Sequence, residues 1–383
     1  MASCKVSGSE HEKIVCLLDS VLDSNSEESD ISDDEVSLNN CDVINGSEGI
    51  ESSELDSESE ELELPANTRR ANLENCNWSW NSEENIPVIH QFNAHSGVSD
   101  VIFRKYENNS PSEMSVFSDF MDPLFSIIAA ETNNYAERQL QNEARKRRKD
   151  DDKWFPTTED EIKAYIALCI LMAQVRKPRV KLYWSKEACI ETPIFGQTMS
   201  RERFLLLSRF LHFADDINND EADKLKKLRP ILTHFSKKIS ELYHLCQNIS
   251  LDESLMKYRG RLSYVQCNHS KRARFGIKIY KICDSDTGYC HSFKIYTGQD
   301  ITNPSLPAST NVVIDMCEPL FNKGHTLFID NWYTSPDLCK MVLERGTNVV
   351  GTVRPNRKNM PPDVSSTKLK IGEHQIWSAN NII

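Results

Sequence analysis

The feature that most constrains the fold of this chain is a series of short apolar segments between residues 249 and 353, each bounded by turn-forming residues. The first three have the length and composition of β-strands. They predict strands at Ile249–Leu255, Phe275–Cys283 and Tyr289–Tyr296. The turn Asp286-Thr287-Gly288 lies between the second and third segments, so these two are expected to form a hairpin.

Two helices and two further strands are predicted after this hairpin, in alternation. Apolar residues at helical spacing predict a helix from Val312 to Leu320, and the apolar run Thr326–Ile329 predicts a strand buried on both faces. A second helix is expected to begin at Ser335-Pro336 and to end at Gly346, and the last strand is expected at Asn348–Val353. The order strand, strand, strand, helix, strand, helix, strand predicts an α/β fold with a ribonuclease H-like core in residues 248–354.

Residues 116–247 are expected to form a separate helical domain with its own core. Asp122 and Pro123 have the residue types of an N-cap and a first turn, and Thr158 with Glu161 has the pattern of a capping box. A third helix is predicted after Ser200. A fourth helix is predicted across the apolar positions Ile231, Phe235, Ile239 and Leu242.

The N-terminal region differs from the rest of the chain in charge. Residues 1–65 contain 19 acidic residues against Lys5 and Lys13, whereas the remainder is mildly basic, although the whole chain has a net charge of -12. A serine-rich acidic segment with few aromatic residues cannot bury enough apolar surface to offset its conformational entropy. We therefore expect residues 1–115 to be a disordered acidic tail followed by a linker over residues 67–109, with order beginning near Phe117.

Cysteine spacing and hydropathy argue against several classes of protein. The twelve cysteines include no C-x-x-C pair and follow no secretory signal, so neither a disulfide framework nor a zinc finger is expected. The cysteines are better explained as reduced thiols of a protein in the cytosol or nucleus. The longest apolar run, Ala164–Ala173, has ten residues, against the roughly 20 that a membrane-spanning helix needs, so no membrane segment is expected.

Two aspartates stand out as candidates for metal-dependent chemistry. Asp252 lies within the first predicted strand and Asp330 directly follows the fourth, and these two strands are neighbours in the predicted fold. Paired carboxylates repel unless a cation neutralises them, and Mg²⁺ or Mn²⁺ prefers such hard oxygen ligands. On spacing alone, the commoner interpretation is structural, with Asp252 as a strand-edge residue and Asp330 capping a turn with Asn331.

The sequence around these aspartates resembles one family. Six landmarks occur in the family's order: Ser250–Arg261, Phe275–Lys278, Thr287–Tyr289, Tyr296–Gly298, Asp330–Ser335 and Gly351–Arg357. On these motifs the chain resembles the piggyBac transposases and the proteins derived from that transposable element. The resemblance extends from residue 116 to about residue 376.

The resemblance implies a function in DNA strand transfer. Asp252 and Asp330 would be the first two residues of a catalytic acidic triad that binds Mg²⁺ or Mn²⁺, acting on double-stranded DNA through hairpin-ended intermediates with insertion at TTAA. A nuclear location is implied, and a homodimer is possible, with residues 116–247 serving dimerisation or DNA binding.

The resemblance also raises the question of activity. The family's third aspartate lies beyond an insertion after the fifth strand, so residues 355–383 are expected to begin that insertion and the core to be partial; Asp363 and Glu373 come too early for the third position. We expect this chain to be inactive in strand transfer as it stands. The alternative from another class is a domesticated, non-catalytic protein that binds DNA, chromatin or a protein partner.

Basic and aromatic residues give further candidates for DNA contact. Lys257, Arg259 and Arg261 alternate after Asp252 and would project one way from an extended chain, as a phosphate-contacting row should; a solvated strand edge is the alternative. Further positive charge is nearby in sequence, at Lys271, Arg272, Arg274 and Lys278.

Two other features remain open between a structural and a functional interpretation. The run from Arg145 to Lys149 fits a nuclear import signal, a phosphate patch or a charged helix end opposite Asp150–Asp152. Trp332 and Tyr333 could stack on an unpaired base, but packing is the commoner role of aromatic residues after a core strand.

Overall fold

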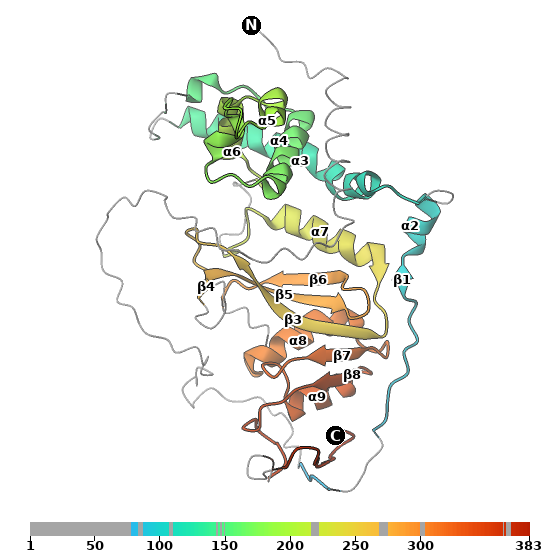
Figure 1. Ribbon diagram of the computed structural model, residues 1–383. Coiled ribbons are helices and arrows are strands. Elements are labelled where there is room, and N and C mark those ends of the chain that lie inside the picture. Colours follow the sequence, from blue (N-terminus) through green and yellow to red (C-terminus); the bar gives the residue numbers. More distant parts are fainter. Residues whose placement is uncertain are drawn as a thin grey trace, which may run out of the picture. The chain divides into compact units, whose positions relative to one another are not determined.

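The structure is a computed structural model that describes residues 78–82, 87–106, 110–142, 145, 148, 150–215, 222–267, 275–298, 303–362, 364 and 369–383. These residues divide into two compact units (Figure 1). The helical unit comprises residues 106–235, and the sheet unit comprises residues 78–105 together with residues 236–383. The predicted acidic tail, residues 1–65, lies outside the described residues.

The helical unit is built from capped helices around an aromatic-rich core. Ser112, Thr158 and Ser200 each cap a helix by accepting a hydrogen bond from the backbone amide three residues further on. The core includes Phe125, Ile162 and Leu207, all almost fully buried. The helices are α3 (Glu113–Gln141), α4 (Glu159–Gln174), α5 (Pro193–Thr198) and α6 (Arg201–Phe210), with 3-10 turns at η1 (Asp151–Lys153) and η2 (Val180–Trp184).

The predicted start of the first of these helices was wrong. Helix α3 begins at Glu113, because Ser112 accepts the amide of Ser115, and Pro123 lies inside the helix. An internal proline removes one helical hydrogen bond. The burial of Leu124 and Phe125 directly after it, at 1% and 2% exposure, stabilises the helix through that position.

A buried ion pair joins α4 to α6 within the helical unit. Arg203 is 6% exposed, and its guanidinium donates to both carboxylate oxygens of Glu161, at 2.7 and 2.5 Å. A third bond reaches the carbonyl of Phe155 at 3.0 Å, and the guanidinium lies 3.7 Å from the centre of the Phe155 ring. Thr157 donates to the same Glu161 carboxylate at 2.6 Å, so the buried guanidinium and the partly buried carboxylate are both hydrogen-bonded.

The predicted fourth helix is α7 (Arg229–Leu242), and the division between the two units falls within it. The sheet unit contains all seven elements predicted between residues 249 and 353. They are β3 (Asn248–Lys257), β5 (Phe275–Asp284), β6 (Cys290–Ile295), α8 (Ala308–Cys317), β7 (Thr326–Ile329), α9 (Pro336–Leu343) and β8 (Asn348–Gly351).

The sheet mixes parallel and antiparallel pairs, and its strand order runs β6-β5-β3-β7-β8 (Figure 1). The pairs β3–β5 and β5–β6 are antiparallel, whereas β3–β7 and β7–β8 are parallel. A short strand that was not predicted, β4 (Val265–Cys267), also pairs with β5. The fold is thus mixed α/β, with the first predicted strand at its centre.

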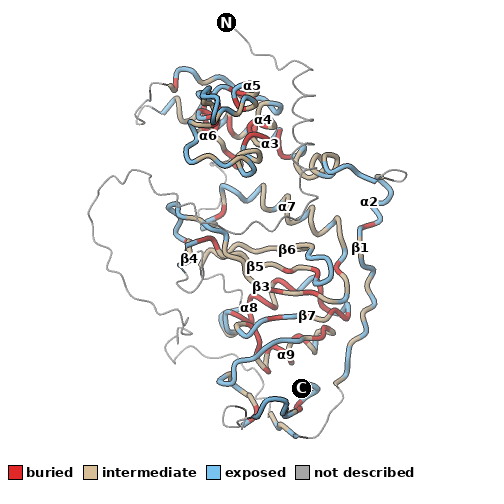
Figure 2. Tube along the Cα trace, viewed as in Figure 1, coloured by how far each residue is buried: buried red, intermediate tan, exposed pale blue. Residues whose placement is uncertain are grey.

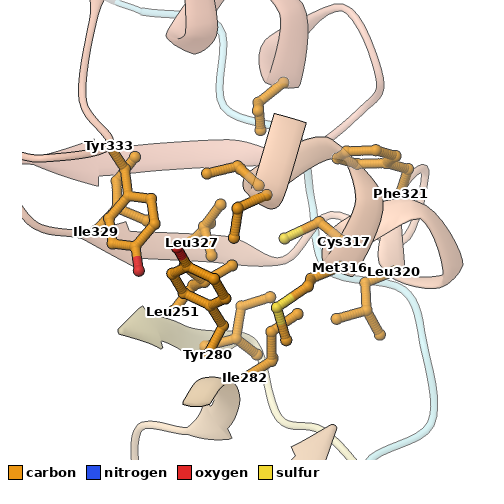
Figure 3. Packing of buried hydrophobic residues seen from close by; sticks show 14 of the residues in the cluster. Leu251, Tyr280, Ile282, Met316, Cys317, Leu320, Phe321, Leu327, Ile329 and Tyr333 are labelled. Carbon is orange, nitrogen blue, oxygen red and sulfur yellow. The ribbon is translucent and has the colours of Figure 1, made fainter. Parts of the chain in front are cut away.

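One face of the sheet packs against α8 and α9, and we call it the core face. Leu251 of β3, Ile282 of β5 and Leu327 of β7 are at most 1% exposed there and belong to one cluster with residues of both helices (Figures 2 and 3). Successive side chains of a strand point to opposite faces. Residues that alternate with the buried ones, such as Asp252 on β3 and Lys281 on β5, therefore lie on the opposite face, which we call the second face.

The segment that was expected to be part of a linker is instead packed along the sheet unit. We call residues 87–98 the strap. Asn348 of β8 exchanges hydrogen bonds with the backbone of His90, both at 2.9 Å, and the amide of Asn93 donates to the carbonyl of Lys323. The strap ends in β1 (Gly97–Val98), which pairs with β2 (Tyr243–His244) and leads into α2 (Asp100–Lys105). A linker was therefore the wrong prediction for these residues.

Within the described part of the chain, no helix combines the length and the apolar character needed to cross a membrane.

Candidate functional site

Asp252 and Asp330 occupy matching positions on neighbouring parallel strands. Leu251 of β3 is the register partner of Ile329 of β7, and one aspartate follows each of them. Neighbouring strands lie about 4.8 Å apart. Leu251 and Ile329 are buried whereas both aspartates are exposed. The register therefore brings two solvent-accessible carboxylate residues to the point where β7 ends.

The turn after β7 holds Asp330 in place. Its Oδ1 accepts the amide of Trp332 at 2.9 Å, and its backbone carbonyl accepts the Thr334 hydroxyl at 2.7 Å. On β3, the Oδ1 of Asp252 accepts the amide of Glu253 at 2.7 Å. Asp330 thus caps a turn, which is the structural role considered for it from the sequence. This role uses one of its two carboxylate oxygens.

The aromatic residues beside Asp330 pack into the core. Tyr333 is 0% exposed (Figure 3), so it cannot stack on a base, and its hydroxyl donates to Glu253 at 3.2 Å. Burial, reinforced by the negative charge of Glu253, raises the pKa of Tyr333, which therefore remains a donor at physiological pH. Trp332 is half-buried and stacks on Tyr280 with ring centroids 6.2 Å apart. Packing is the role that these contacts support.

The basic residues after Asp252 do not form the predicted row. Strand β3 ends at Lys257, and Arg259 and Arg261 lie in the irregular segment that follows, so an alternating projection from one extended strand was wrong. All three residues are nevertheless exposed.

Lys278 lies on the core face, because it pairs with Leu255 of β3. Its ammonium lies 4.6 Å from the centre of the Trp332 ring and 4.9 Å from that of Tyr280. The remaining predicted DNA-contacting residues, Lys271, Arg272 and Arg274, lie outside the described residues.

Lys281, which the sequence did not single out, is the register partner of Asp252 on β5. Opposite residues of an antiparallel pair point to the same side of the sheet. Lys281 therefore shares the second face with Asp252. The only signal in the sequence was its position within the predicted strand, which cannot reveal the pairing.

A cluster of three possible metal ligands lies elsewhere in the sheet unit. Ligand atoms of Cys246, Asp284 and Asp286 lie within 4.8 Å of one another. However, the buried Asp284 carboxylate already accepts the backbone amides of Cys246, Asp286 and Thr287 at 2.8–3.0 Å. Burial by itself would raise the pKa of Asp284, but these amide bonds outweigh it and lower the pKa. The carboxylate organises the β5–β6 turn.

Histidines line a cavity of about 270 Å³ beside the strap: His95, His244, His291 and His325, with Lys323 also in the wall. The Nδ1 of His291 is buried and has no hydrogen-bond partner within the described part of the chain. Burial, helped by the nearby charge of Lys323, lowers the pKa of His291 to about 4. Burial likewise lowers the pKa of His325. At these two positions the cavity therefore favours the neutral imidazole.

In the helical unit, the described part of the basic run is used structurally. Arg145 donates to the carbonyl of Gln139 at 3.2 Å and lies 3.4 Å from the carboxylate of the buried Asp151. Asp151 also accepts Arg209 at 2.7 Å. These contacts favour the charged helix-end interpretation for Arg145, while Lys146, Arg147 and Lys149 lie outside the described residues.

Comparison with known proteins identifies a family and two relatives that this chain resembles in sequence. The family described as "Transposase IS4" matches residues 112–383. The human protein "PiggyBac transposable element-derived protein 2" is 26% identical over 336 residues, covering 86% of this chain and 54% of that protein. The human "PiggyBac transposable element-derived protein 3" is 27% identical over 219 residues, covering 56% of this chain and 37% of that protein. The chain thus spans about half or less of the length of these relatives.

A solved structure shares the fold. The "Cryo-EM structure of piggyBac transposase synaptic complex with hairpin DNA" has a TM-score of 0.60 to this chain, at 24% sequence identity. The similarity covers 72% of this chain and 57% of that one. The mixed α/β fold described above is therefore similar to that of a piggyBac transposase.

Proposed function

This chain belongs to the family of piggyBac-type transposases, and on that basis we propose that it binds double-stranded DNA at a ribonuclease H-like core with a divalent metal site. Asp252 and Asp330 are the metal-binding residues in this proposal. The observation that carries it is the parallel register of β3 and β7, in which Leu251 opposite Ile329 sets the two aspartates at matching positions.

The topology of the sheet supports the ribonuclease H-like assignment. Three antiparallel strands in the spatial order β6-β5-β3 continue into the parallel strands β7 and β8, as expected for residues 248–354 of such a core. Helices α8 and α9 make the two crossovers that precede β7 and β8 and pack into one cluster.

The donor set fits the metals that the family implies. Carboxylate oxygens are the hard ligands that Mg²⁺ and Mn²⁺ prefer, and both aspartates are exposed to solvent. Divalent ions bound to such carboxylates activate an attacking oxygen and stabilise a leaving oxygen in phosphodiester chemistry. The chain's own contribution is orientation: the amide of Trp332 fixes Asp330, and Tyr333 ties Glu253 of β3 to the turn after β7.

The exposed residues Lys257, Arg259 and Arg261 supply phosphate contacts in this proposal, together with the predicted Lys271, Arg272 and Arg274. Lys278 contributes less, because its ammonium covers two aromatic rings on the core face. Phosphate contacts of this kind give affinity without sequence preference and a strong dependence on salt. We further propose that residues 116–247 mediate homodimerisation or DNA binding, and that the protein acts on DNA in the nucleus.

Mn²⁺ binding followed by electron paramagnetic resonance tests the metal site. Asp252→Asn and Asp330→Asn should each weaken binding, whereas Glu318→Gln, which neutralises an exposed carboxylate elsewhere on the sheet unit, should not. Equal Mn²⁺ affinity in all four proteins would contradict the site.

A plasmid-nicking assay with Mg²⁺ or Mn²⁺ then separates the two functional classes. Metal-dependent nicking that Asp252→Ala abolishes would establish an enzyme. Salt-sensitive DNA binding without nicking would instead favour the non-catalytic DNA-binding protein.

A further inference from the structure

The second face of the sheet carries a basic side chain beside Asp252. Four lysines lie in the described strands: Lys257, Lys278, Lys281 and Lys294. Three of them lie on the core face, because Lys278 pairs with Leu255, Lys257 follows Leu255 by two residues, and Lys294 pairs with the buried Tyr280. Of these four, Lys281 alone shares a face with Asp252.

The register sets Lys281 directly across from Asp252. The two are Cα partners in the antiparallel β3–β5 pair, and opposite residues in such a pair have Cβ atoms about 4.5–5.5 Å apart. Asp252 in turn sits at the position matching Asp330 on the other side of β3. The order across the second face is therefore Lys281, Asp252, Asp330, with the ammonium residue on one flank of the two carboxylates.

The charges of Lys281 and Asp252 both affect the pKa of the Cys283 thiol. Cys283 lies two residues beyond Lys281 on the same face, opposite Ser250. Burial and the neighbouring Cys290 raise the pKa of Cys283 to about 11; Lys281 acts to lower this pKa and Asp252 acts to raise it. By the register, Cys283, Lys281 and Asp252 occupy adjacent positions of β5 and β3 on the second face.

We propose that Lys281 binds a backbone phosphate of the DNA strand held at Asp252 and Asp330. This inference rests on the proposed function, since it assigns a phosphate contact to the same site. When a divalent metal ion binds the two carboxylates, the ammonium of Lys281 lies beside a second positive charge. A phosphodiester supplies an anion that compensates for this charge. An ammonium on a flexible stem suits this contact, because it acts as a point charge that does not require one fixed geometry.

The structural alternative is that Lys281 only neutralises Asp252 across the two strands. That role requires no DNA and would reveal itself through metal binding and folding. The phosphate contact would instead reveal itself through the number of counterions released on DNA binding, because each neutralised phosphate contributes about 0.9 to the slope of log affinity against log salt concentration.

Lys281→Gln and Lys294→Gln form a matched pair of variants. Both replace a strand lysine, but Lys294 lies on the core face in an ion pair with Asp315 at 2.7 Å. Binding of a fluorescent duplex should be measured by anisotropy over a series of salt concentrations. We expect Lys281→Gln to reduce the slope by about 0.9 and to weaken binding several-fold at low salt. Lys294→Gln should keep the wild-type slope, and Lys281→Arg should restore it.

The outcomes separate this inference from the proposed function. Wild-type protein that binds DNA with an unchanged slope in Lys281→Gln would overturn the phosphate contact and leave the proposed function standing. An altered Mn²⁺ affinity or melting temperature in Lys281→Gln, with the slope intact, would assign Lys281 to neutralising Asp252. Wild-type protein that does not bind the duplex would overturn the proposed function and this inference together.

Discussion

Removing the charge of Glu161 should destabilise the helical unit more than a single side-chain change usually does. Glu161→Gln preserves the shape of the side chain but leaves the guanidinium of Arg203, only 6% exposed, without a compensating charge. Breaking a buried ion pair from one side costs about 3–5 kcal/mol. Because the amide oxygen of glutamine still accepts one hydrogen bond, we expect a loss near the lower end, about 3 kcal/mol. That is a large fraction of the roughly 5–15 kcal/mol that stabilises a typical domain.

The matched control lies on the same helix. Glu159 forms an ion pair with Lys163 at 3.3 Å, but its side chain is 45% exposed, and exposed pairs contribute about 0–1 kcal/mol. Glu159→Gln should therefore cost less than about 1 kcal/mol. The double variant Glu161→Leu with Arg203→Met should recover part of the loss, since an apolar pair avoids the stranded charge.

Urea unfolding followed by circular dichroism measures these differences, and amide hydrogen exchange in α4 and α6 shows whether the loss is local to the helices that the pair joins. The reasoning would be refuted if Glu161→Gln and Glu159→Gln had the same free energy of unfolding, or if the exchange rates of α4 and α6 stayed at wild-type values in Glu161→Gln.

Three other perturbations test the sheet unit. Asp284→Asn should cost about 1–3 kcal/mol, because buried amide donors lose their charged acceptor. Since the folded pKa of Asp284 is lowered, its stabilisation is present above the usual carboxyl pKa of 3.8 and is lost as the pH falls through the folded value; acid titration of the variant should lack this loss. His291 has a folded pKa of about 4 against an ordinary 6.5, so wild-type stability should fall as the pH drops from 6.5 towards 4. A smaller fall in His291→Phe would support this account, whereas an identical pH profile would contradict it. Gly324 has φ +76° and lies against the backbone of Gln91 in the strap. Gly324→Ala should therefore lower the free energy of unfolding of the sheet unit by more than about 1 kcal/mol. Gly372→Ala, at φ +89° with no neighbour within 4 Å, carries the conformational strain alone, and equal losses in the two variants would rule out the contact with Gln91.

Local patterns in the sequence were sufficient to predict most of the sheet unit. Strand β5, with Phe275, Ile277 and Ile279 alternating, and helix α9, with its Ser335 cap, are specified by residues close to one another in the chain. The start of α3 was mispredicted because Asp122-Pro123 is a plausible local start, whereas the burial of Leu124 and Phe125 carries the helix through the proline.

The features that the sequence did not reveal depend on long-range pairing. The strap is polar and lacks periodicity, and its order comes from partners such as Asn348, 258 positions away from His90. The two aspartates could be nominated from the sequence, but the neighbourhood of Asp252 could not. Lys281 becomes visible beside Asp252 only when the register of β3 and β5 is known.

The path of the chain through the two units sets an order on folding. The helical unit is an insertion within the sheet unit, between β1 and β2, and those strands pair while the amide of Ser99 donates to the carbonyl of Leu242 at 2.9 Å. Closing so long a loop is entropically costly unless the inserted segment is already compact. During synthesis the helical unit can fold as soon as it emerges, whereas the strap must wait for Asn348. The N-terminal part of the sheet unit is thus made before its partners in β2 and β8 and is among the last segments to pair.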